Sequence, residues 1–427
     1  MSRSRIAAGA VDRWLARPLH ARLVALLVIA IGTAAMLWPR LNQDDVHWLV
    51  DLQVYQGAGL AVRHGHSLYD YTTPFPQRLP FTYPPFGGLL SIPLSLLSRY
   101  PLGIVWTIVE FGVLAFLVWK LFRPLLARSG RYSPLAYAGL LVVAENVVPV
   151  RDTFYFGQVN LFLVGLVVVD LTVARGKWPR GLLVGLAAAI KLTPALFIPY
   201  LWMIGRRKAA GVAAATFIGA QLLAAVLIPG DSRRYWTSTV FEGQRLGLNT
   251  VVSNQAIRGM LLRLVLPSPF GSLLWVVLAV PVAVIGLRRA QRAYDEGEVV
   301  LSIGLVGLTA ALVSPVSWIH HFVWILLVVA GLLGPARDFR RTMWAAGLTL
   351  AFCVDIPYWG QGLVNGNGSY IAGRVLQEAD LLLTLVVVTA LTWRRQILAS
   401  VDPVQLTSPE VTIVSDGEAA SRPVVTP

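Results

Sequence analysis

The chain has 427 residues, of which 56% are hydrophobic and 14% are charged, and its mean hydropathy is +0.64. This composition excludes an ordinary soluble protein and favours a polytopic membrane protein. The net charge of +14 would suit a nucleic-acid-binding protein, but the basic residues gather in short turns between apolar runs, so we expect no nucleic-acid partner. The single cysteine, Cys353, excludes a disulfide framework and a thiolate metal cluster.

Apolar runs long enough to cross a bilayer, which takes roughly 20 helical residues, recur along the chain. The first run, residues 20–39, follows an Arg-rich N-terminus. It lacks a convincing small-residue cleavage site, so we interpret it as a retained span and not as a signal peptide. The sequence therefore predicts an all-α polytopic membrane protein with about 12 transmembrane or half-spanning helices.

The positive charges predict which turns are cytoplasmic. The cytoplasmic side would hold both termini and the basic turns 120–131, 174–180, 205–208, 287–292 and 335–341. Turns 174–180 and 205–208 enclose only one apolar stretch, so this stretch must be a helical hairpin or two half-helices broken around residues 191–194, where a Lys and a Pro disfavour a continuous helix. Because successive spans must alternate in direction, residues 83–98 must lie along the outer surface or re-enter the membrane without crossing it.

Four connections are too long to be simple turns, and all four fall on the outer side. They are the predicted loops 40–100, 151–157, 229–270 and 356–378. We expect interfacial helices within loop 40–100 and one integral membrane domain over residues 1–398. Residues 399–427 mix Ser, Thr, Pro and Val without periodicity, which predicts a disordered cytoplasmic tail. Function should therefore reside on the outer face.

The outer loop nearest the N-terminus contains the strongest candidate for a catalytic carboxylate. Residues 49–65 are predicted to form a short helix near the membrane surface, with Asp51 and Tyr55 one turn apart on one face. A carboxylate at the bilayer edge suits a general base, although Asp51 could instead cap this helix. The adjacent Asp44 and Asp45 suit a solvated loop, and with His47 they are the place where a divalent metal would bind if one were needed.

Lys191 is the most informative cation, because a Lys inside an apolar run is a functional candidate by default. It would neutralise a phosphate, or it would pair with a buried acid such as Glu145. Residues 314–324 bring His320 and His321 to the outer mouth of a helix, and since adjacent helical positions diverge, we expect only one of them to face a ligand.

Two further outer stretches, 151–160 and 249–259, are rich in amides and arginines. Amides suit sugar hydroxyls and arginines suit phosphates, while solvation and helix capping are the alternatives. The candidates are Arg151, Asp152, Gln158, Asn160, Asn254, Gln255 and Arg258. The aromatic, Gly-rich stretch 355–370 could offer ring faces to a sugar or anchor the chain at the interface.

Six stretches, taken together, resemble signatures of one enzyme family. They are DLQVY, LPFTYPPFGGLL, FGQVN, AIKLTP, VSNQAIRG and SPVSWIHH, in this order between residues 51 and 321. The chain thereby resembles the polyprenol-phosphate-sugar-dependent membrane glycosyltransferases of the GT-C fold, and more narrowly glycosyltransferase family 87. Within that family it is most similar to the actinobacterial α-1,2-mannosyltransferases of phosphatidylinositol mannosides and lipomannans.

The resemblance implies inverting transfer of mannose from polyprenyl-phospho-β-mannose to a glycolipid on the outer leaflet of the plasma membrane, on the extracytoplasmic side. It implies that Asp51 is the general base and that His320 or His321 lies near the donor phosphate or the acceptor. Lys191, Arg258 and Arg151 are the candidates for the donor phosphate. The substrate-binding candidates are Tyr55, Tyr83, Gln158, Asn160, Asn254, Gln255 and Trp318.

No DxD motif typical of nucleotide-sugar enzymes occurs in the outer loop, so we expect no nucleotide donor, no metal and no cofactor. Transfer of arabinofuranose, or branching of lipomannan, would use the same architecture. A lipid transporter or flippase would concentrate polar residues in the membrane too, but such proteins commonly contain repeats, and none is evident. A noncatalytic membrane subunit would leave Asp51 and Lys191 without a task. The sequence does not indicate an oligomeric state.

Overall fold

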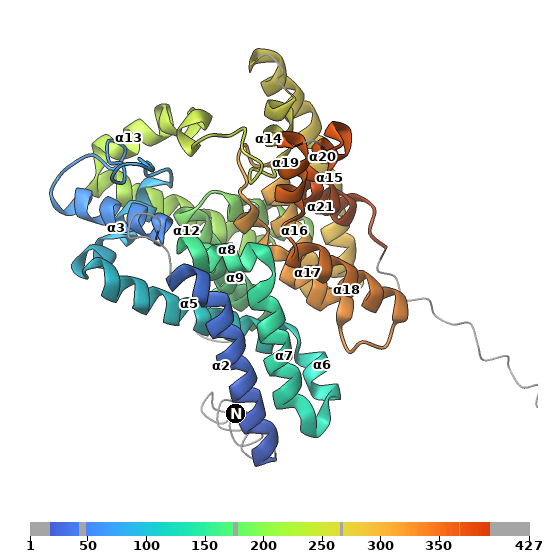
Figure 1. Ribbon diagram of the computed structural model, residues 1–427. Helices are drawn as coiled ribbons and strands as arrows, with labels where there is room; N and C mark the ends of the chain where they lie inside the picture. The colour runs from blue at the N-terminus through green and yellow to red at the C-terminus, as the bar shows by residue number, and fades with distance from the viewer. Residues whose placement is uncertain (1–17, 42–47, 174–177, 265–267, 367, 393–427) are drawn as a thin grey trace, which may run out of the picture. The chain divides into compact units, whose positions relative to one another are not determined.

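A computed structural model describes residues 18–41, 48–173, 178–264, 268–366 and 368–392 (Figure 1). Across these ranges the chain is mostly helical and forms no strand, apart from the isolated bridges Thr72–Pro80 and Asn254–Trp318. The predicted all-α class is confirmed. Asp44, Asp45, His47 and the predicted tail 399–427 lie outside the described residues.

The described ranges hold twenty α-helices, with shorter 3-10 segments and one π-helical segment between some of them. The α-helices are α2 (Leu19–Leu41), α3 (Val50–Arg63), α4 (Pro85–Leu90), α5 (Arg99–Leu121), α6 (Arg123–Arg128), α7 (Ser133–Asn146), α8 (Val148–Phe156), α9 (Asn160–Val168), α10 (Leu182–Ile190), α11 (Phe197–Met203), α12 (Arg207–Leu227), α13 (Pro229–Thr237), α14 (Ile257–Arg263), α15 (Ser268–Asp295), α16 (Val299–Val313), α17 (Ile325–Leu333), α18 (Phe339–Cys353), α19 (Ile356–Asn365), α20 (Tyr370–Gln377) and α21 (Ala379–Thr389). The 3-10 segments are η1 (Ile92–Leu96), η2 (Gly130–Tyr132), η4 (Thr193–Leu196), η5 (Thr239–Phe241), η6 (Gly243–Leu246) and η7 (Ile319–Trp324), and η3 (Val169–Val173) is π-helical.

Among the described residues, four helices are long and apolar enough to cross a membrane: α2, α5, α12 and α15. The pair α7 and α8, bent by 70°, is a fifth candidate, either as a broken span or as a re-entrant loop. Other apolar helices are shorter; α16, for example, has 15 residues and would extend about 22 Å, less than the hydrocarbon core. The expected count of about 12 is therefore not confirmed, while the membrane class is supported.

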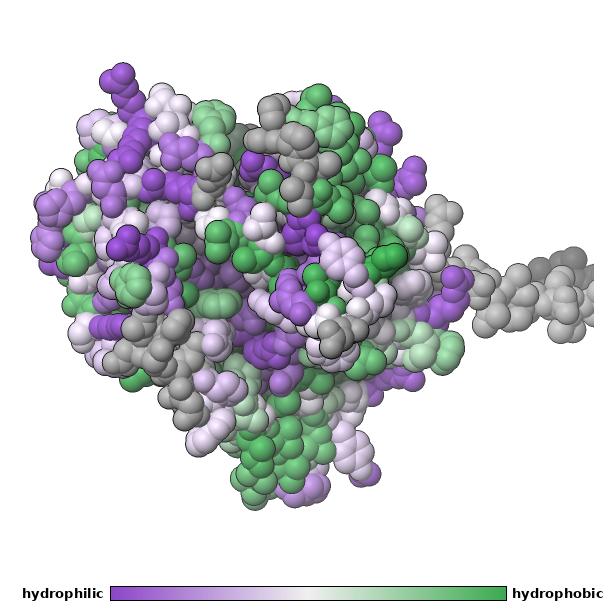
Figure 2. Space-filling view, turned by 45° about the horizontal axis from the view of Figure 1, so that its top comes forward, coloured by the Kyte–Doolittle hydropathy of each residue, from purple (hydrophilic) through white to green (hydrophobic). Residues whose placement is uncertain are grey.

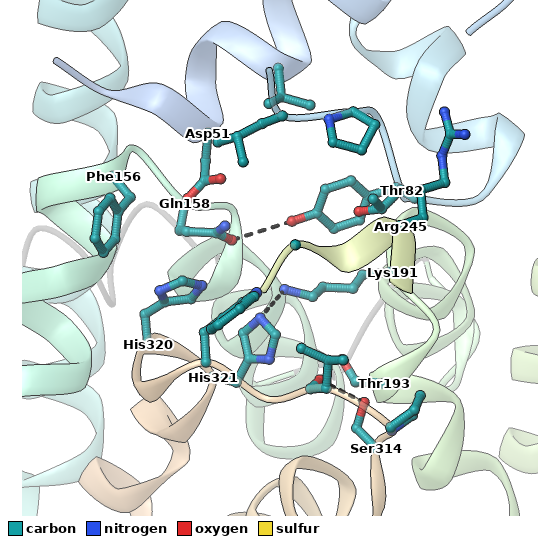
Figure 3. A pocket seen from close by; sticks show the side chains of 18 of the residues that line it. Asp51, Thr82, Phe156, Gln158, Lys191, Thr193, Arg245, Ser314, His320 and His321 are labelled. Atoms are coloured by element: carbon teal, nitrogen blue, oxygen red, sulfur yellow. Dashed lines mark hydrogen bonds between the residues drawn. The ribbon is translucent and has the colours of Figure 1, made fainter. Parts of the chain in front are cut away.

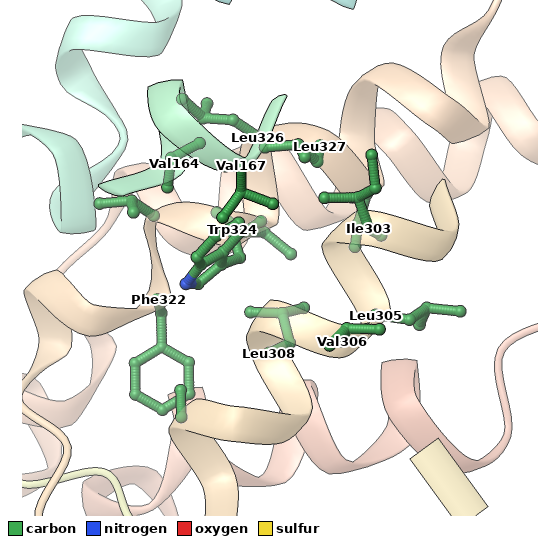
Figure 4. Close-up of a cluster of buried hydrophobic side chains, with 14 of the residues drawn as sticks. Val164, Val167, Ile303, Leu305, Val306, Leu308, Phe322, Trp324, Leu326 and Leu327 are labelled. Carbon is green, nitrogen blue, oxygen red and sulfur yellow. The ribbon is translucent and has the colours of Figure 1, made fainter. Parts of the chain in front are cut away.

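The long helices and the shorter apolar helices differ in where their side chains lie. On α12, Leu222 and Val226 are 61% and 77% exposed, as expected for a helix that faces lipid. By contrast, α16 is buried almost throughout and packs against α15, α17 and η7 (Figure 4). Gly307 allows this contact, since a Cβ there would lie 2.0 Å from the Trp324 indole. The shorter helices form the core beneath the site.

The predicted break in the chain at Lys191 is confirmed. Helix α10 ends at Ile190, Lys191 is extended with φ −144° and ψ 134°, and the 3-10 segment η4 leads into α11. Pro194, near the start of η4, cannot continue a regular helix, because it lacks an N–H. The break turns the Lys191 side chain out of the helical stack and toward the cavity described below.

Two predicted outer loops are wholly or largely helical, and a third is partly helical, and the sequence did not predict these particular helices. Helix α8 occupies most of 151–157, α13 and α14 lie within 229–270, and α19 and α20 fill most of 356–378. These helices are short and carry Gly, Pro and polar residues, which hide the apolar periodicity. The face in Figure 2, turned forward from the top of Figure 1, carries many hydrophilic side chains above an apolar surface.

Candidate active site

Segments far apart in the sequence meet around one cavity of about 410 Å³ (Figure 3). Its walls come from the start of α3, residues 79–84, α8 and the turn after it, the break at 191–193, residues 235–248 and residues 314–321. Of the predicted site residues, the cavity is lined by Asp51, Tyr55, Tyr83, Gln158, Lys191, Trp318, His320 and His321. The cavity therefore unites most of the residues that the sequence singled out.

Asp51 lies in the first turn of α3, on the same face as Tyr55, as predicted. Leu49 is the N-cap residue, in the left-handed conformation, and no side chain caps this helix, so the capping alternative for Asp51 is wrong. Desolvation raises the pKa of the Asp51 carboxyl to about 6, against the opposing effects of a hydrogen bond from Gln158 and the charge of Lys191. Asp51 is thus a stronger base than an exposed aspartate.

Gln158 connects Asp51 to two tyrosines. The hydroxyl of Tyr55 lies 3.2 Å from Gln158 Oε1 and 2.9 Å from the hydroxyl of Tyr83, which lies 3.4 Å from the same oxygen. Since hydroxyls approach the amide oxygen, the amide nitrogen is directed to the Asp51 carboxylate. Gly157 makes this turn possible, with φ +70° and only 2.9 Å between its ideal Cβ position and the Cβ of Leu52.

Lys191 has only uncharged partners within hydrogen-bond distance among the described residues. Its Nζ donates to Asn160 Oδ1 at 2.9 Å, lies 2.9 Å from His321 Nε2, and is 5.3 Å from the centre of the Tyr83 ring. The suggested pairing with Glu145 is wrong, because Glu145 accepts from the hydroxyl of Thr33 instead. Burial lowers the pKa of this amine to about 7, against the opposing charge of Asp51, so a bound anion would favour its charged form.

Both histidines of η7 line the cavity, so the prediction that only one would face it is wrong. His321 contacts Lys191 through Nε2, and its Nδ1 lies 3.4 Å from the Ser317 hydroxyl. His320 is 5% exposed, its ring packs edge-on against Phe156 and His321, and its Nε2 has no hydrogen-bond partner in the described part of the chain. The cavity reaches both rings because it extends around the start of η7.

Asn254 and Gln255 are fully buried, and neither lines the cavity. Asn254 accepts from the Ser317 N–H at 3.0 Å, and Gln255 binds the Gln377 carbonyl at 2.7 Å and the Leu381 N–H at 3.0 Å. The Asn254 amide thus holds the backbone at Ser317, and the Gln255 amide holds the backbone at Gln377 and Leu381. The prediction that both bind substrate is wrong, because their buried side chains bind neighbouring backbone and do not face the cavity.

Asn160 contacts a cavity residue, Lys191, but does not line the main cavity itself. It lies at the start of α9, is buried, and its amide donates to the His320 carbonyl at 3.0 Å while its oxygen accepts from Lys191. Asn160 does not line the main cavity, but it borders a small adjoining pocket together with Thr193 and His321. The structure therefore assigns it to positioning Lys191.

The cavity includes neither Arg151 nor Arg258, the two arginines predicted to bind phosphate. Arg151 forms an ion pair with Asp355 at 2.7 Å, and the guanidinium of Arg258 lies 5.8 Å from the centre of the Trp275 ring. Arg245 of η6 lines the cavity instead, hydrogen-bonded to the Tyr69 carbonyl. Sequence reasoning missed Arg245, since one arginine in a long loop carries no distinguishing signal.

Comparisons with known proteins find one matching family and several curated relatives. The profile of "Glycosyltransferase family 87" matches residues 81–315. Two curated relatives, from Mycobacterium tuberculosis and Mycolicibacterium smegmatis, are named polyprenol-phosphate-mannose-dependent alpha-(1-2)-phosphatidylinositol mannoside mannosyltransferase. They are 36% and 35% identical over 78% and 77% of this chain and 81% and 79% of their own lengths. A second Mycolicibacterium smegmatis protein, named as the corresponding pentamannoside mannosyltransferase, is 35% identical over 75% of this chain and 78% of its own length. No solved structure matches the chain.

Proposed function

Because this chain belongs to glycosyltransferase family 87, we propose that it transfers mannose from polyprenyl-phospho-β-mannose to a hydroxyl of a phosphatidylinositol mannoside, forming an α-1,2 linkage. The names of its relatives support this donor and this class of acceptor. The observation that carries the proposal is the placement of the Asp51 carboxylate and the Lys191 ammonium in one cavity, each held by its own hydrogen-bond partners.

The proposed reaction uses these two groups in turn. Asp51 takes the proton from the acceptor hydroxyl as its oxygen attacks the anomeric carbon of the mannose. The bond from that carbon to the phosphate oxygen breaks on the opposite face, which inverts the β-linkage of the donor to α. Polyprenyl phosphate leaves as an anion, and Lys191, with His321 beside it, stabilises the charge that develops. No separate general acid is required.

The proposal includes a sidedness and a membrane fold. We infer that the cavity opens on the extracytoplasmic side of the plasma membrane, with both termini in the cytoplasm, since the basic turns favour that orientation. The shorter apolar helices would complete a GT-C bundle as half-spanning elements. We also propose that transfer needs no metal and no cofactor. A chelator in every assay tests the metal part of this proposal.

The test is mannosyl transfer by purified full-length protein, with polyprenyl-phospho-mannose and a phosphatidylinositol tetramannoside. We expect Asp51→Asn to lower the rate by about 10²-fold or more, the scale of losing a general base. The control is Asp295→Asn, the same change at an exposed carboxylate at the end of α15. A folded Asp51→Asn variant with nearly normal activity would show that Asp51 is not the general base. A wild type that is inactive with the mannosyl donor but active with polyprenyl-phospho-arabinose would show that the transferred sugar is arabinose.

A further inference from the structure

A second group of polar side chains lines the cavity and has no task in the proposed transfer. Asp152 of α8, Tyr358 of α19 and Glu242, which lies between η5 and η6, all belong to the lining. Asp152 is partly buried, with 20% of its side chain exposed. These groups add two carboxyl groups and an aromatic ring to a cavity whose other polar groups include Lys191 and Arg245. Burial raises the pKa of the Asp152 carboxyl to about 7, against the charge of Arg151.

Contacts made by Tyr358 and by Arg151, the neighbour of Asp152, hold these two lining residues in place. Arg151 binds both carboxylate oxygens of Asp355, at 3.0 and 2.7 Å, and so ties α8 to the start of α19. Tyr358, in the first turn of α19, forms a side-chain hydrogen bond with Ser253. The two lining residues therefore stand next to this ion pair on two elements that it holds together.

An independent observation points to a ligand at this end of the cavity. Phe156 lies one turn after Asp152 on α8, lines the cavity and packs against the ring of His320 at 5.6 Å. His320 is 95% buried, and its Nε2 has no hydrogen-bond partner among the described residues, although it lies at the cavity. A buried polar atom without a partner costs free energy unless a ligand or water satisfies it.

The chemistry of this group selects the ligand. Carboxyl groups and an imidazole nitrogen exchange hydrogen bonds with hydroxyls, and the rings of Phe156 and Tyr358, which both line the cavity, offer apolar faces. The charge of Glu242 is offset by Arg245, whose Nη1 lies 3.9 Å from Glu242 Oε2, and the donor phosphate is assigned to Lys191, so this end of the cavity needs no charged ligand. Figure 3 shows Phe156 and His320 on the side of Asp51, with His321 and Lys191 beyond them. A neutral polyhydroxyl ring next to the reacting hydroxyl would supply hydroxyls to these polar groups and an apolar face to the two rings.

We propose that Asp152, Tyr358 and His320 form a subsite for a sugar ring of the acceptor. This ring lies next to the donor mannose, which is attacked by the acceptor hydroxyl that Asp51 deprotonates. This inference rests on the proposed function, because it assigns one end of the same cavity to the acceptor. The subsite determines which glycolipid is used, since the carboxylate of Asp152 accepts hydrogen bonds from hydroxyls that the acceptor must present.

The test measures the KM of the acceptor and of the donor separately in Asp152→Asn and Asp152→Ala. We expect the acceptor KM to rise by about tenfold or more, the scale of losing a hydrogen bond to a charged group, while the donor KM changes less than threefold. The control is again Asp295→Asn. Unchanged acceptor KM values in both Asp152 variants would overturn the proposal, and so would an equal rise in both KM values.

A binding measurement keeps the proposal falsifiable if catalysis is lost. In an Asp51→Asn background, we expect soluble α-1,2-mannobiose to compete with the acceptor for binding, and Asp152→Asn to weaken this competition about tenfold. Competition that is equal with and without Asp152→Asn would overturn the subsite. Failure of the wild type to transfer mannose would instead overturn the proposed function, so the two failures are distinguishable.

Discussion

At the scale of single residues, Gln158 has more consequence than its neutral side chain suggests. It is 3% exposed, and its amide joins the hydroxyls of Tyr55 and Tyr83 to the carboxylate of Asp51. A hydrogen bond to a carboxylate favours the ionised form, so Gln158 opposes the desolvation that raises the pKa of Asp51 to about 6. Gln158 is thus a positioning residue that keeps the proposed base both oriented and ionised.

Replacing Gln158 with Leu should change the pH dependence of the reaction. In the proposed mechanism activity requires ionised Asp51, so kcat/KM should fall as the pH drops through the pKa of this carboxyl. The variant loses the hydrogen bond that lowers this pKa, while Lys191 still acts on the carboxylate. The acid limb therefore moves to higher pH. We expect a fall of about tenfold at pH 7 that is partly recovered as the pH is raised.

The matched control for this prediction is Gln56→Leu, on α3, the helix that carries Asp51. Gln56 donates to the Leu97 carbonyl at the surface and does not line the cavity, so its loss should leave the acid limb unchanged. An acid limb at the wild-type pH in Gln158→Leu, measured from kcat/KM across the pH range, would show that Gln158 has no effect on Asp51.

At the scale of elements, the sequence predicted those features that a local rule controls. The break at Lys191 followed from Lys and Pro within an apolar run, and α3 followed from its spacing of apolar residues. The short helices α8, α19 and α20 were missed, because eight to ten residues that include Gly, Pro and polar groups give no clear period. The contact between Lys191 and His321 joins residues 130 positions apart, which no local pattern encodes. For the same reason Asp152 was only one of several candidates, and the contact between Phe156 and His320 was not expected.

The turn between α8 and α9 supplies a test of an element. Gly157 has φ +70°, and a Cβ there would meet Leu52 at 2.9 Å and Leu49 at 3.1 Å. Gly157→Ala therefore combines backbone strain with a clash, and we expect it to cost about 1–3 kcal/mol of stability. Because the turn carries Gln158, transfer activity should also fall. Thermal unfolding in detergent measures the first effect and the transfer assay the second.

Helix α12 offers a matched control for this substitution. Gly219 lies within α12, with no atom within 4 Å of an added Cβ, so Gly219→Ala should be neutral or slightly stabilising. Equal melting temperatures for the Gly157 and Gly219 variants would contradict the strain assigned to the turn.

At the scale of the whole molecule, the cavity and the basic turns come from different sets of connections. The cavity takes its walls from residues of 50–55, 79–84, 235–248 and 314–321, whereas the basic turns lie at α6 and at the starts of α12 and α18. A charge bias of this kind orients membrane proteins, because basic connections are retained in the cytoplasm. A lipid-linked donor and a glycolipid acceptor would then reach Asp51 from the opposite leaflet.

This orientation predicts a difference in accessibility between two engineered cysteines. In a Cys353→Ala background, Thr237→Cys at the end of α13 should react with a membrane-impermeant maleimide in intact cells, and Ala127→Cys on α6 should react only after permeabilisation. Both native side chains are exposed, so burial does not separate them. Reaction of both after permeabilisation, with transfer activity retained, is the control. Labelling of Ala127→Cys in intact cells, with Thr237→Cys protected, would reverse the orientation and place the cavity of Asp51 and Lys191 on the cytoplasmic side, where an extracytoplasmic glycolipid could not be its acceptor.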